Sequence, residues 1–459
     1  MMHVKPIHKR GSNLIEDYRS EQESIMQYFS YNPFHEDAYQ MRLQELNDRH
    51  FKREELARVL TVCNEKWGAG KKSIENINRL LDKESVAVVG GQQAGLLTGP
   101  LYTIHKMISI LMLAKEQEEK LGIPVVPIFW IAGEDHDFPE INHIELPEPP
   151  YMKKYKIVEK HFKKEPVSSK AFNKEEAMKW LENIFVNLEE TNWTKELYNQ
   201  MQRCVAESNS YVDFFAKVTF TLFPNEGLVL LDSNDPNIRQ LESDYFVQMI
   251  KNRQEIAFGV RELLKHTSKE GYSVALDAET DDGHLFYHLD GERILLTINE
   301  QGEWAGKNGE CSFTEEELVA IAKEKPYLLS NNVVTRPIMQ DLLLPVLAFI
   351  GGPGEIAYWS VLKKGFEALD IQMPPVVPRL SFTLVDHVAS KRLAKLGLKL
   401  EDVLENGTLE EKGFWLKRQM NPPIEELADH LRFAIEKAHK PLKEAAQEMQ
   451  ADLGRLADK

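Results

Sequence analysis

The sequence predicts an α/β protein built on a parallel β-sheet, and two observations support this fold class. Short apolar runs at residues 86–89, 123–131 and 346–350 have the length and composition of buried strands. A glycine-rich or acidic loop follows each run, and after the first and third a segment with helical spacing of apolar residues comes next. Alternation of strands with helices is typical of parallel sheets whose faces are covered by helices.

The first strand leads into the stretch GGQQAGLLTGPLYTIHKMISIL, residues 90–111. Its glycines let the backbone approach a ligand, and Pro100 suits a first helical position. Amide donors at a helix start suit phosphate or carboxylate oxygens, and His105 is near enough to face the same crevice. The alternative is that the glycines only make a tight turn and that His105 is a core histidine. This stretch alone leaves both interpretations open.

An acidic cluster, Glu134, Asp135, His136 and Asp137, directly follows the strand at 123–131. Ligands of open parallel sheets bind at the carboxyl ends of strands, so this cluster and the glycine loop are expected to face one crevice. A carboxylate beside an imidazole can orient it and tune its pKa, which suits proton transfer. A divalent cation or a simple polar turn are alternatives. Consecutive side chains cannot all point inward, so we predict no permanent metal site.

Two further units continue the core. Residues 346–350 are followed by a loop with Gly351, Gly352 and Gly354 and by a helix from about Glu355, and residues 375–382 are expected to form the last strand. The segment LVLLDSNDPNIRQL predicts a short strand and a helix that Asp235 and Pro236 begin. Asp232, at the end of that strand, suits either a cap or a substrate contact.

Changes in composition divide the chain into seven regions. The second insert contains Asp290 and Gly291 between apolar runs, which predicts a hairpin, and Thr314 is a plausible helix cap. The regions are an N-terminal helical region (1–80), the first part of the core (81–146), connecting insert 1 (147–210), the continued core (211–255), connecting insert 2 (256–330), the last part of the core (331–385) and a helical coiled coil (386–459).

The C-terminal region has apolar residues at alternating steps of three and four, the signature of a coiled coil. Pro441 is expected to kink the helix or to begin a new segment. The pattern runs to the end without a stop signal, so we expect the coiled coil to be incomplete in this sequence. The apolar positions are Ile424, Leu427, Leu431, Ile435, Ala438, Leu442, Ala445, Met449, Leu453 and Leu456.

Composition restricts the class of function. The 459 residues include 72 acidic and 56 basic side chains, a formal net charge of −16, which argues against a nucleic-acid partner and favours small-molecule substrates. Three cysteines without metal-type spacing suit a reducing compartment. The N-terminus lacks the apolar segment of a signal peptide, and no run is long enough to span a membrane. We therefore expect a cytoplasmic protein with no membrane partner.

Residues 98–105, TGPLYTIH, resemble the TGPLHIGH form of the signature of class I aminoacyl-tRNA synthetases and nucleotidylyl transferases. In those enzymes the histidines help to hold ATP. Here Tyr102 replaces the first histidine, Ile104 replaces the glycine and His105 matches the last histidine. The second, lysine-serine signature has only a faint echo at Ser390 and Lys391. An enzyme of this kind acting on another amino acid is one alternative function, and a non-catalytic coiled-coil scaffold is another.

Over nearly the whole chain the sequence more closely resembles the bacillithiol-biosynthesis cysteine ligases (BshC). The passages that carry this resemblance are GGQQAGLLTGPLYTIHK, PVVPIFWIAGEDHDFPEINH, TRPIMQDLLLPVLAFIGGPGEIAYW and VVPRLSF. The resemblance implies a Rossmann-like core with two connecting inserts and a C-terminal coiled coil that supports a homodimer. It also implies the last step of bacillithiol biosynthesis, in which cysteine is joined to the amine of glucosaminyl-malate.

Such a ligation requires an activated cysteine carboxylate, and ATP with magnesium is the implied source. We expect His105 to donate to charge on the phosphates, and Asp135 or His136 to accept the proton of the attacking amine. Glu134 or Asp137 would hold sugar hydroxyls or the cysteine ammonium, and Arg336 and Arg379 would bind the malate carboxylates. The expected nucleotide-binding residues are Gly90, Gly91, Gln92, Gln93, Thr98, Gly351, Gly352, Gly354 and Glu355.

Overall fold

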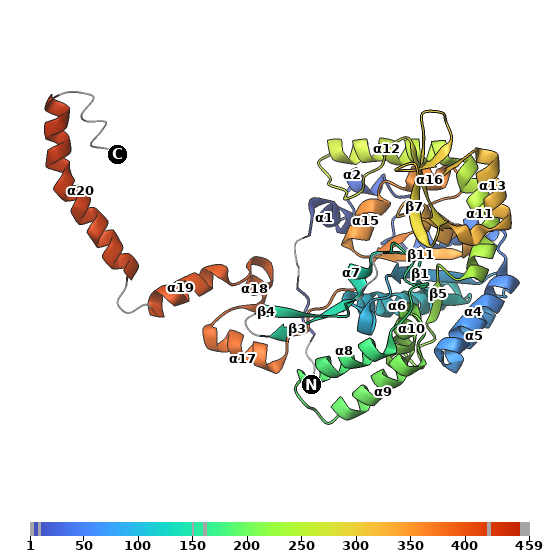
Figure 1. Cartoon of the computed structure of the whole chain (residues 1–459), viewed down its shortest axis with the longest axis horizontal. Coiled ribbons are helices and arrows are strands. Elements are labelled where there is room, and N and C mark those ends of the chain that lie inside the picture. The colour runs from blue at the N-terminus through green and yellow to red at the C-terminus, as the bar shows by residue number, and fades with distance from the viewer. Residues whose placement is uncertain (1–3, 8–10, 149–150, 159–162, 420–423, 450–459) are drawn as a thin grey trace. The chain divides into compact units, whose positions relative to one another are not determined.

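The computed structural model describes residues 4–7, 11–148, 151–158, 163–419 and 424–449 (Figure 1). The chain divides into two compact units. The larger unit is Gly11–Phe382, and the smaller unit combines Met1–Arg10 with Thr383–Lys459.

A five-stranded parallel sheet forms the centre of the larger unit, with strand order β12-β11-β1-β2-β5. The strands predicted from the apolar runs are confirmed, and β2 and β11 are buried along their whole length, as central strands should be. The last strand is shorter than predicted, because the Leu380 N–H donates to Ser109 Oγ instead of to a strand. The bounds are β1 (Val86–Gln92), β2 (Val125–Ile131), β5 (Val229–Asp232), β11 (Val346–Gly351) and β12 (Val376–Pro378).

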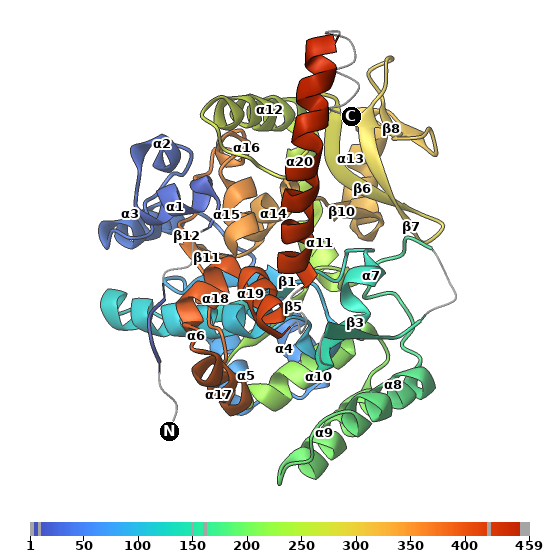
Figure 2. The same cartoon turned by 90° about the vertical axis from the view of Figure 1, so that its left-hand side faces the viewer.

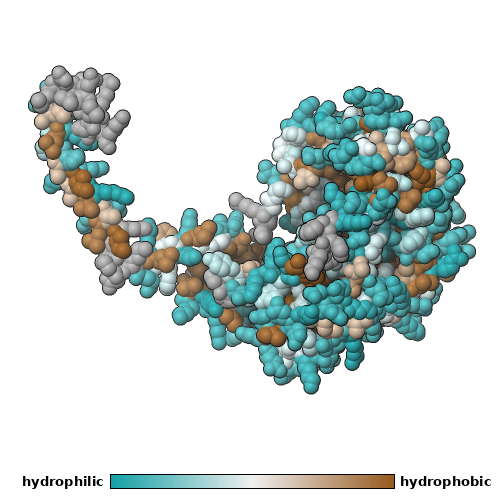
Figure 3. Space-filling model, viewed as in Figure 1, coloured by the Kyte–Doolittle hydropathy of each residue, from teal (hydrophilic) through white to brown (hydrophobic). Residues whose placement is uncertain are grey.

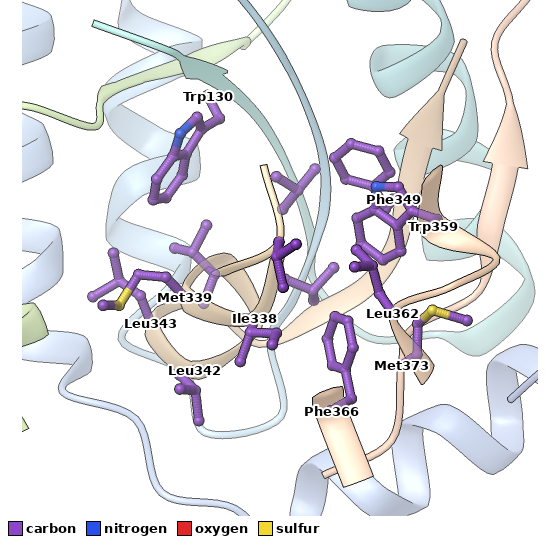
Figure 4. Close-up of a cluster of buried hydrophobic side chains, with 14 of the residues drawn as sticks. Trp130, Ile338, Met339, Leu342, Leu343, Phe349, Trp359, Leu362, Phe366 and Met373 are labelled. Carbon is purple, nitrogen blue, oxygen red and sulfur yellow. The ribbon is translucent and has the colours of Figure 1, made fainter. Parts of the chain in front are cut away.

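Alternate side chains of the central strands enter two hydrophobic clusters, one on each face of the sheet. Figure 4 shows part of one cluster, where the rings of Phe349 and Trp359 stack with centroids 4.3 Å apart. Helices follow the strands as predicted, and Asp235 caps the helix after β5 with its side chain. The helices that follow β1, β5 and β11 are α6 (Tyr102–Leu121), α11 (Pro236–Lys251) and α15 (Pro353–Trp359), and two more core helices are α14 (Thr335–Leu343) and α16 (Lys363–Glu367).

The N-terminal region is helical, as predicted, and it packs on the core. Arg42 is completely buried, donates from Nε to the carbonyl oxygen of Val346 at 2.9 Å, and pairs with Asp341. These contacts attach the region to the sheet and explain its structural role. The helices are α1 (Asn13–Arg19), α2 (Glu23–Met26), α3 (Asp37–Asn47), α4 (Arg53–Trp67) and α5 (Lys71–Arg79).

An antiparallel hairpin lies across residue 147, where the first insert was predicted to begin. The sequence did not predict this hairpin, because its strands are polar and exposed. Two helices then lie side by side, as Figure 2 shows for α8 and α9, and a buried helix returns the chain to the core. The elements around this insert are the short helices η1 (Leu96–Thr98) and α7 (Phe138–Ile141), then β3 (His143–Glu148), β4 (Tyr151–Lys156), α8 (Lys174–Val186), α9 (Thr194–Glu207) and α10 (Tyr211–Leu222).

The second insert contains a five-stranded antiparallel sheet of order β10-β6-β7-β8-β9. The predicted hairpin is confirmed: Asp290 and Gly291 join β6 to β7 with positive φ angles of 50° and 84°. The predicted cap is also confirmed, since Thr314 forms a capping box with Glu317. The elements are α12 (Arg253–Lys269), β6 (Asp282–Leu289), β7 (Glu292–Ile298), β8 (Trp304–Gly306), β9 (Ser312–Phe313), α13 (Glu315–Glu324), η2 (Pro326–Leu328) and β10 (Leu329–Asn331).

All secondary structure in the described part of the smaller unit is helical. The predicted helix is present as α20, which continues through Pro441. Of the two expected effects of this proline, a new segment is therefore wrong, and a kink stays a prediction. Apolar side chains along α20 are exposed, and Figure 3 shows them in brown. Leu453 and Leu456 lie outside the described residues. The helices are α17 (His387–Leu396), α18 (Leu400–Asn406), α19 (Leu409–Gln419) and α20 (Ile424–Met449). Across the described parts of both units, no helix is long and apolar enough to cross a membrane.

Candidate active site

A cavity of about 610 Å³ opens at the carboxyl ends of β1, β2 and β11. The loops after β1 and β2 both contribute to it, as the sequence predicted. We call this cavity the crevice. Nine of the predicted site residues line it, namely Gly91, Gln92, Gln93, Asp135, Arg336, Gly352, Gly354, Glu355 and Arg379.

The first glycines serve close packing of the backbone. Gly90 and Gly91 belong to β1 and pair with Phe129 and Trp130 of β2. A Cβ atom on Gly91 would lie 2.6 Å from the Trp130 carbonyl oxygen, so only glycine fits. Their place in the sheet does not favour the predicted phosphate cradle, and a role in nucleotide binding stays a prediction.

The loop after β1 is a tight turn, the alternative that the sequence left open. The Gly95 N–H donates to the Gln93 carbonyl oxygen at 2.9 Å, and a Cβ atom on Gly95 would lie 2.7 Å from Gly99 Cα. Thr98 is buried, with a positive φ of 72°. By contrast, Gly354 has open space where a Cβ atom would lie, and it lines the crevice.

A buried lysine that the sequence analysis did not single out lies at the crevice. Lys106 Nζ donates to the Gly91 carbonyl oxygen at 2.6 Å and to Gln92 Oε1 at 3.2 Å, and it forms an ion pair with Glu355. Glu355 Oε2 also accepts from the Gly352 N–H at 2.7 Å. The lysine on α6 thus joins the carboxyl end of β1 to the start of α15, the helix after β11.

Arg336 on α14 connects two residues of the acidic cluster. Its Nε donates to Glu134 Oε1 at 2.9 Å, and its Nη2 donates to Asp135 Oδ1 at 2.8 Å. The planar guanidinium makes these two bonds in a fixed geometry. Arg336 therefore orients Asp135 at the edge of the crevice while one fifth of its own side chain remains exposed.

Glu134 lies behind the crevice wall with no exposed surface. It pairs with Arg239 and Arg336, and Oε2 accepts from the Asn331 N–H at 3.2 Å. Burial raises the pKa of this carboxyl, but Arg239, Arg336 and Arg293 outweigh burial and lower the pKa to about 2. Of the two residues expected to hold substrate, Glu134 and Asp137, the buried position of Glu134 does not favour this role, because its oxygens bind arginines inside the protein. Contact between Glu134 and substrate stays a prediction.

His105 is buried and does not line the crevice, because the next residue of α6, Lys106, faces it. The His105 ring packs edge-on against Phe382 with centroids 5.3 Å apart. Burial, and then the charge of Arg379, lowers the pKa of the imidazole. Phosphate contact by His105 stays a prediction that this position does not favour.

The rest of the acidic cluster lies beside the crevice. His136 is half-buried next to Arg293 of β7, and Asp137 is exposed at the start of α7 without capping it. Arg293 is a site residue that the sequence analysis missed, since nothing in the pattern of a hairpin strand links it to a loop more than 150 residues earlier.

The crevice combines both signs of charge. Lys106, Arg336 and Arg379 contribute cations, while Asp135, Glu140 and Glu355 contribute carboxylates. Such a site can bind a small molecule that carries both carboxylate and ammonium groups. Within the described ranges, no group of three His, Cys, Asp or Glu side chains could hold a metal ion.

The order of the parallel strands is that of an α/β protein of the Rossmann-like type. The charged crevice at the carboxyl ends of these strands lies where such proteins bind small molecules. Comparison with known families identifies the particular one. Residues 2–380 match the N-terminal Rossmann-like domain of bacillithiol biosynthesis BshC, and residues 382–459 match its C-terminal coiled-coil domain. The chain belongs to the BshC family, as the resemblance predicted.

Curated relatives agree with this assignment. A protein of Oceanobacillus iheyensis named a cysteine ligase BshC is 45% identical over the whole of this chain and 85% of its own length. A protein of the same name from Bacillus cereus strain ATCC 14579 is 40% identical over the same shares. The relatives therefore share both the Rossmann-like region and the coiled-coil region with this chain.

Proposed function

We propose that this protein is a cysteine ligase of bacillithiol biosynthesis, which joins the cysteine carboxylate to the amine of glucosaminyl-malate. Family membership supports the reaction class. The observation that carries the assignment to a site is that three cations and three carboxylates line one crevice. Both substrates carry carboxylates, and cysteine also carries an ammonium group.

The cations suit the malate part of the acceptor. Arg336 is held by Glu134 and Asp135, and the Arg379 guanidinium lies over the Tyr102 ring at 5.2 Å from its centroid. Arginine forms paired hydrogen bonds with carboxylates, which makes these two side chains suited to a dicarboxylate. With the malate part bound by the arginines, the cysteine ammonium is proposed to bind the carboxylate of Asp135 or of Glu355.

Amide formation needs an activated carboxylate, because an amine does not displace hydroxide from a carboxylate at neutral pH. We propose ATP with magnesium as the activator, which supplies a good leaving group on the cysteine carboxyl carbon. Lys106, Arg379 and the open backbone at Gly354 fit an anionic group of this kind. Asp135 is the proposed acceptor of the amine proton. Its Oδ1 is held by Arg336 and Arg293, and its Oδ2 lies 3.4 Å from Gln93 Nε2.

The proposal includes a cytoplasmic homodimer formed through the coiled-coil region. Leu427, Leu431 and Ile435 on α20 are more than half exposed and lie on one side of the helix. A helix with such a face is stabilised by a partner helix.

Mass spectrometry tests the proposed reaction directly. Purified protein is mixed with cysteine, glucosaminyl-malate, ATP and magnesium, and a parallel sample lacks ATP. We expect bacillithiol only in the complete mixture. Product without ATP would remove ATP from the proposal, and no product from the folded protein with all components would contradict the ligase assignment.

A further inference from the structure

Arg293 reaches from the second insert to the acidic cluster of the core. Its side chain is 2% exposed. Nε donates to Ser330 Oγ at 3.1 Å, and Nη2 donates to the Asn331 carbonyl oxygen at 2.7 Å. The guanidinium also lies over the Phe286 ring, 3.9 Å from the centroid. Together these contacts fix the orientation of the Arg293 guanidinium.

In that orientation Nη1 faces two groups of the acidic cluster. It lies 3.3 Å from Asp135 Oδ1 and 3.2 Å from His136 Nδ1. A guanidinium has only donors and keeps its proton in proteins, so His136 Nδ1 must be the acceptor. An imidazole that accepts at Nδ1 is uncharged and carries its single proton on Nε2.

The other groups around His136 do not reverse this assignment. Burial is the main cause that lowers the pKa of the imidazole, and the charges of Arg293 and Lys164 lower it further. Asp135 and Asp137 act in the opposite direction, but burial and the cations outweigh them. The ring of His136 lies edge-on to Phe286, with centroids 6.1 Å apart, and this contact offers no polar atom.

We propose that Arg293 is a positioning residue that holds His136 uncharged, with Nδ1 occupied and an N–H on Nε2. The catalytic consequence rests on the proposed ligase function. His136 then serves the reaction as a hydrogen-bond donor and not as a base, and the amine proton passes to Asp135. The second insert becomes part of the active site, because one of its strands sets the protonation state of a core histidine.

Nuclear magnetic resonance of the full chain measures this state without any substrate. Histidine labelled with ¹³C at Cδ2 and Cε1 is incorporated, and the His136 signals are assigned by their loss in His136→Asn. In the unmodified protein we expect the Cδ2 shift of the Nε2–H tautomer, with no titration down to a pH below the ordinary pKa of histidine. The Nδ1–H tautomer, or a charged ring at neutral pH, would overturn the proposal even if no variant of Arg293 could be prepared.

Two variants then assign the effect to Arg293. In Arg293→Met, we expect the pKa of His136 to rise and the Nδ1–H tautomer to become populated. Lys164→Met removes a nearby cation that makes no hydrogen bond to the ring, and it should leave the tautomer unchanged. An unchanged tautomer in Arg293→Met, or the same change in both variants, would overturn the role of Arg293. If the ligation assay fails while these signals behave as expected, only the proposed function is lost.

Discussion

Replacing Glu134 by glutamine tests whether the buried carboxylate holds the crevice together. The folded protein lowers the pKa of Glu134 from 4.5 to about 2. A difference of this size means that the charged form stabilises the folded state by about 3 kcal/mol at neutral pH. Glutamine keeps the shape but removes the charge between Arg239 and Arg336, so we expect Glu134→Gln to lower the free energy of unfolding by about 3 kcal/mol.

The free energy of unfolding that Glu134→Gln removes should depend on pH. Because the folded pKa is depressed, the stabilisation is complete above pH 4.5 and is lost as the pH falls toward 2. The difference between Glu134→Gln and the unmodified protein should therefore stay constant from pH 7 to 5.5 and shrink at pH 3.5.

Urea unfolding followed by tryptophan fluorescence measures this difference, since Trp130 and Trp359 are buried in the larger unit. Glu119 is exposed on α6, so Glu119→Gln is a matched control that we expect to change the free energy by less than 0.5 kcal/mol, roughly the range of surface substitutions. A loss below about 1 kcal/mol in Glu134→Gln at pH 7 would refute the claim that the buried carboxylate holds the crevice together.

Three further predictions concern single side chains. Arg336→Lys keeps the charge but cannot bridge Glu134 and Asp135, so we expect KM for glucosaminyl-malate to rise at least roughly tenfold in steady-state assays; an unchanged KM would contradict this. Burial raises the pKa of Asp232 to about 6, so its charged form destabilises the fold at higher pH. Asp232→Asn should therefore raise the melting temperature at pH 7.5 and have no effect at pH 3.5, and the reverse order would refute it. His105→Ala should reduce the ligation rate less than roughly tenfold, because the ring contacts Phe382 outside the crevice. A loss of a thousandfold would restore its predicted phosphate contact.

Periodicity and strand ends made the core predictable. Apolar runs identified the main strands, and the rule for the carboxyl ends of parallel strands brought Gln93, Asp135 and Glu355 to one crevice. These residues lie within four positions of a strand end, so their position depends little on anything distant in the chain.

Two features were not predictable in this way: which side of a helix faces the crevice, and which residues far apart in the sequence form contacts. His105 and Lys106 are neighbours on α6, and only the packing of that helix decides which one faces the crevice. Glu134 has the same local sequence signal as Asp135, but Arg239 of α11 fixes it inside the protein. Arg293 enters the site only because the second insert pairs β6 with β10 next to the core.

The claim that the crevice carries the reaction is tested most directly by comparing ligation by two variants, each of which loses one positive charge. Arg379 lines the crevice and is partly exposed, whereas Lys251 is exposed at the end of α11. The rate of ATP-dependent product formation by mass spectrometry gives kcat/KM for Arg379→Met and for Lys251→Met. We expect kcat/KM to fall at least roughly tenfold in Arg379→Met and not to fall in Lys251→Met. Equal rates in both variants and the unmodified protein would contradict the claim that the crevice carries the reaction.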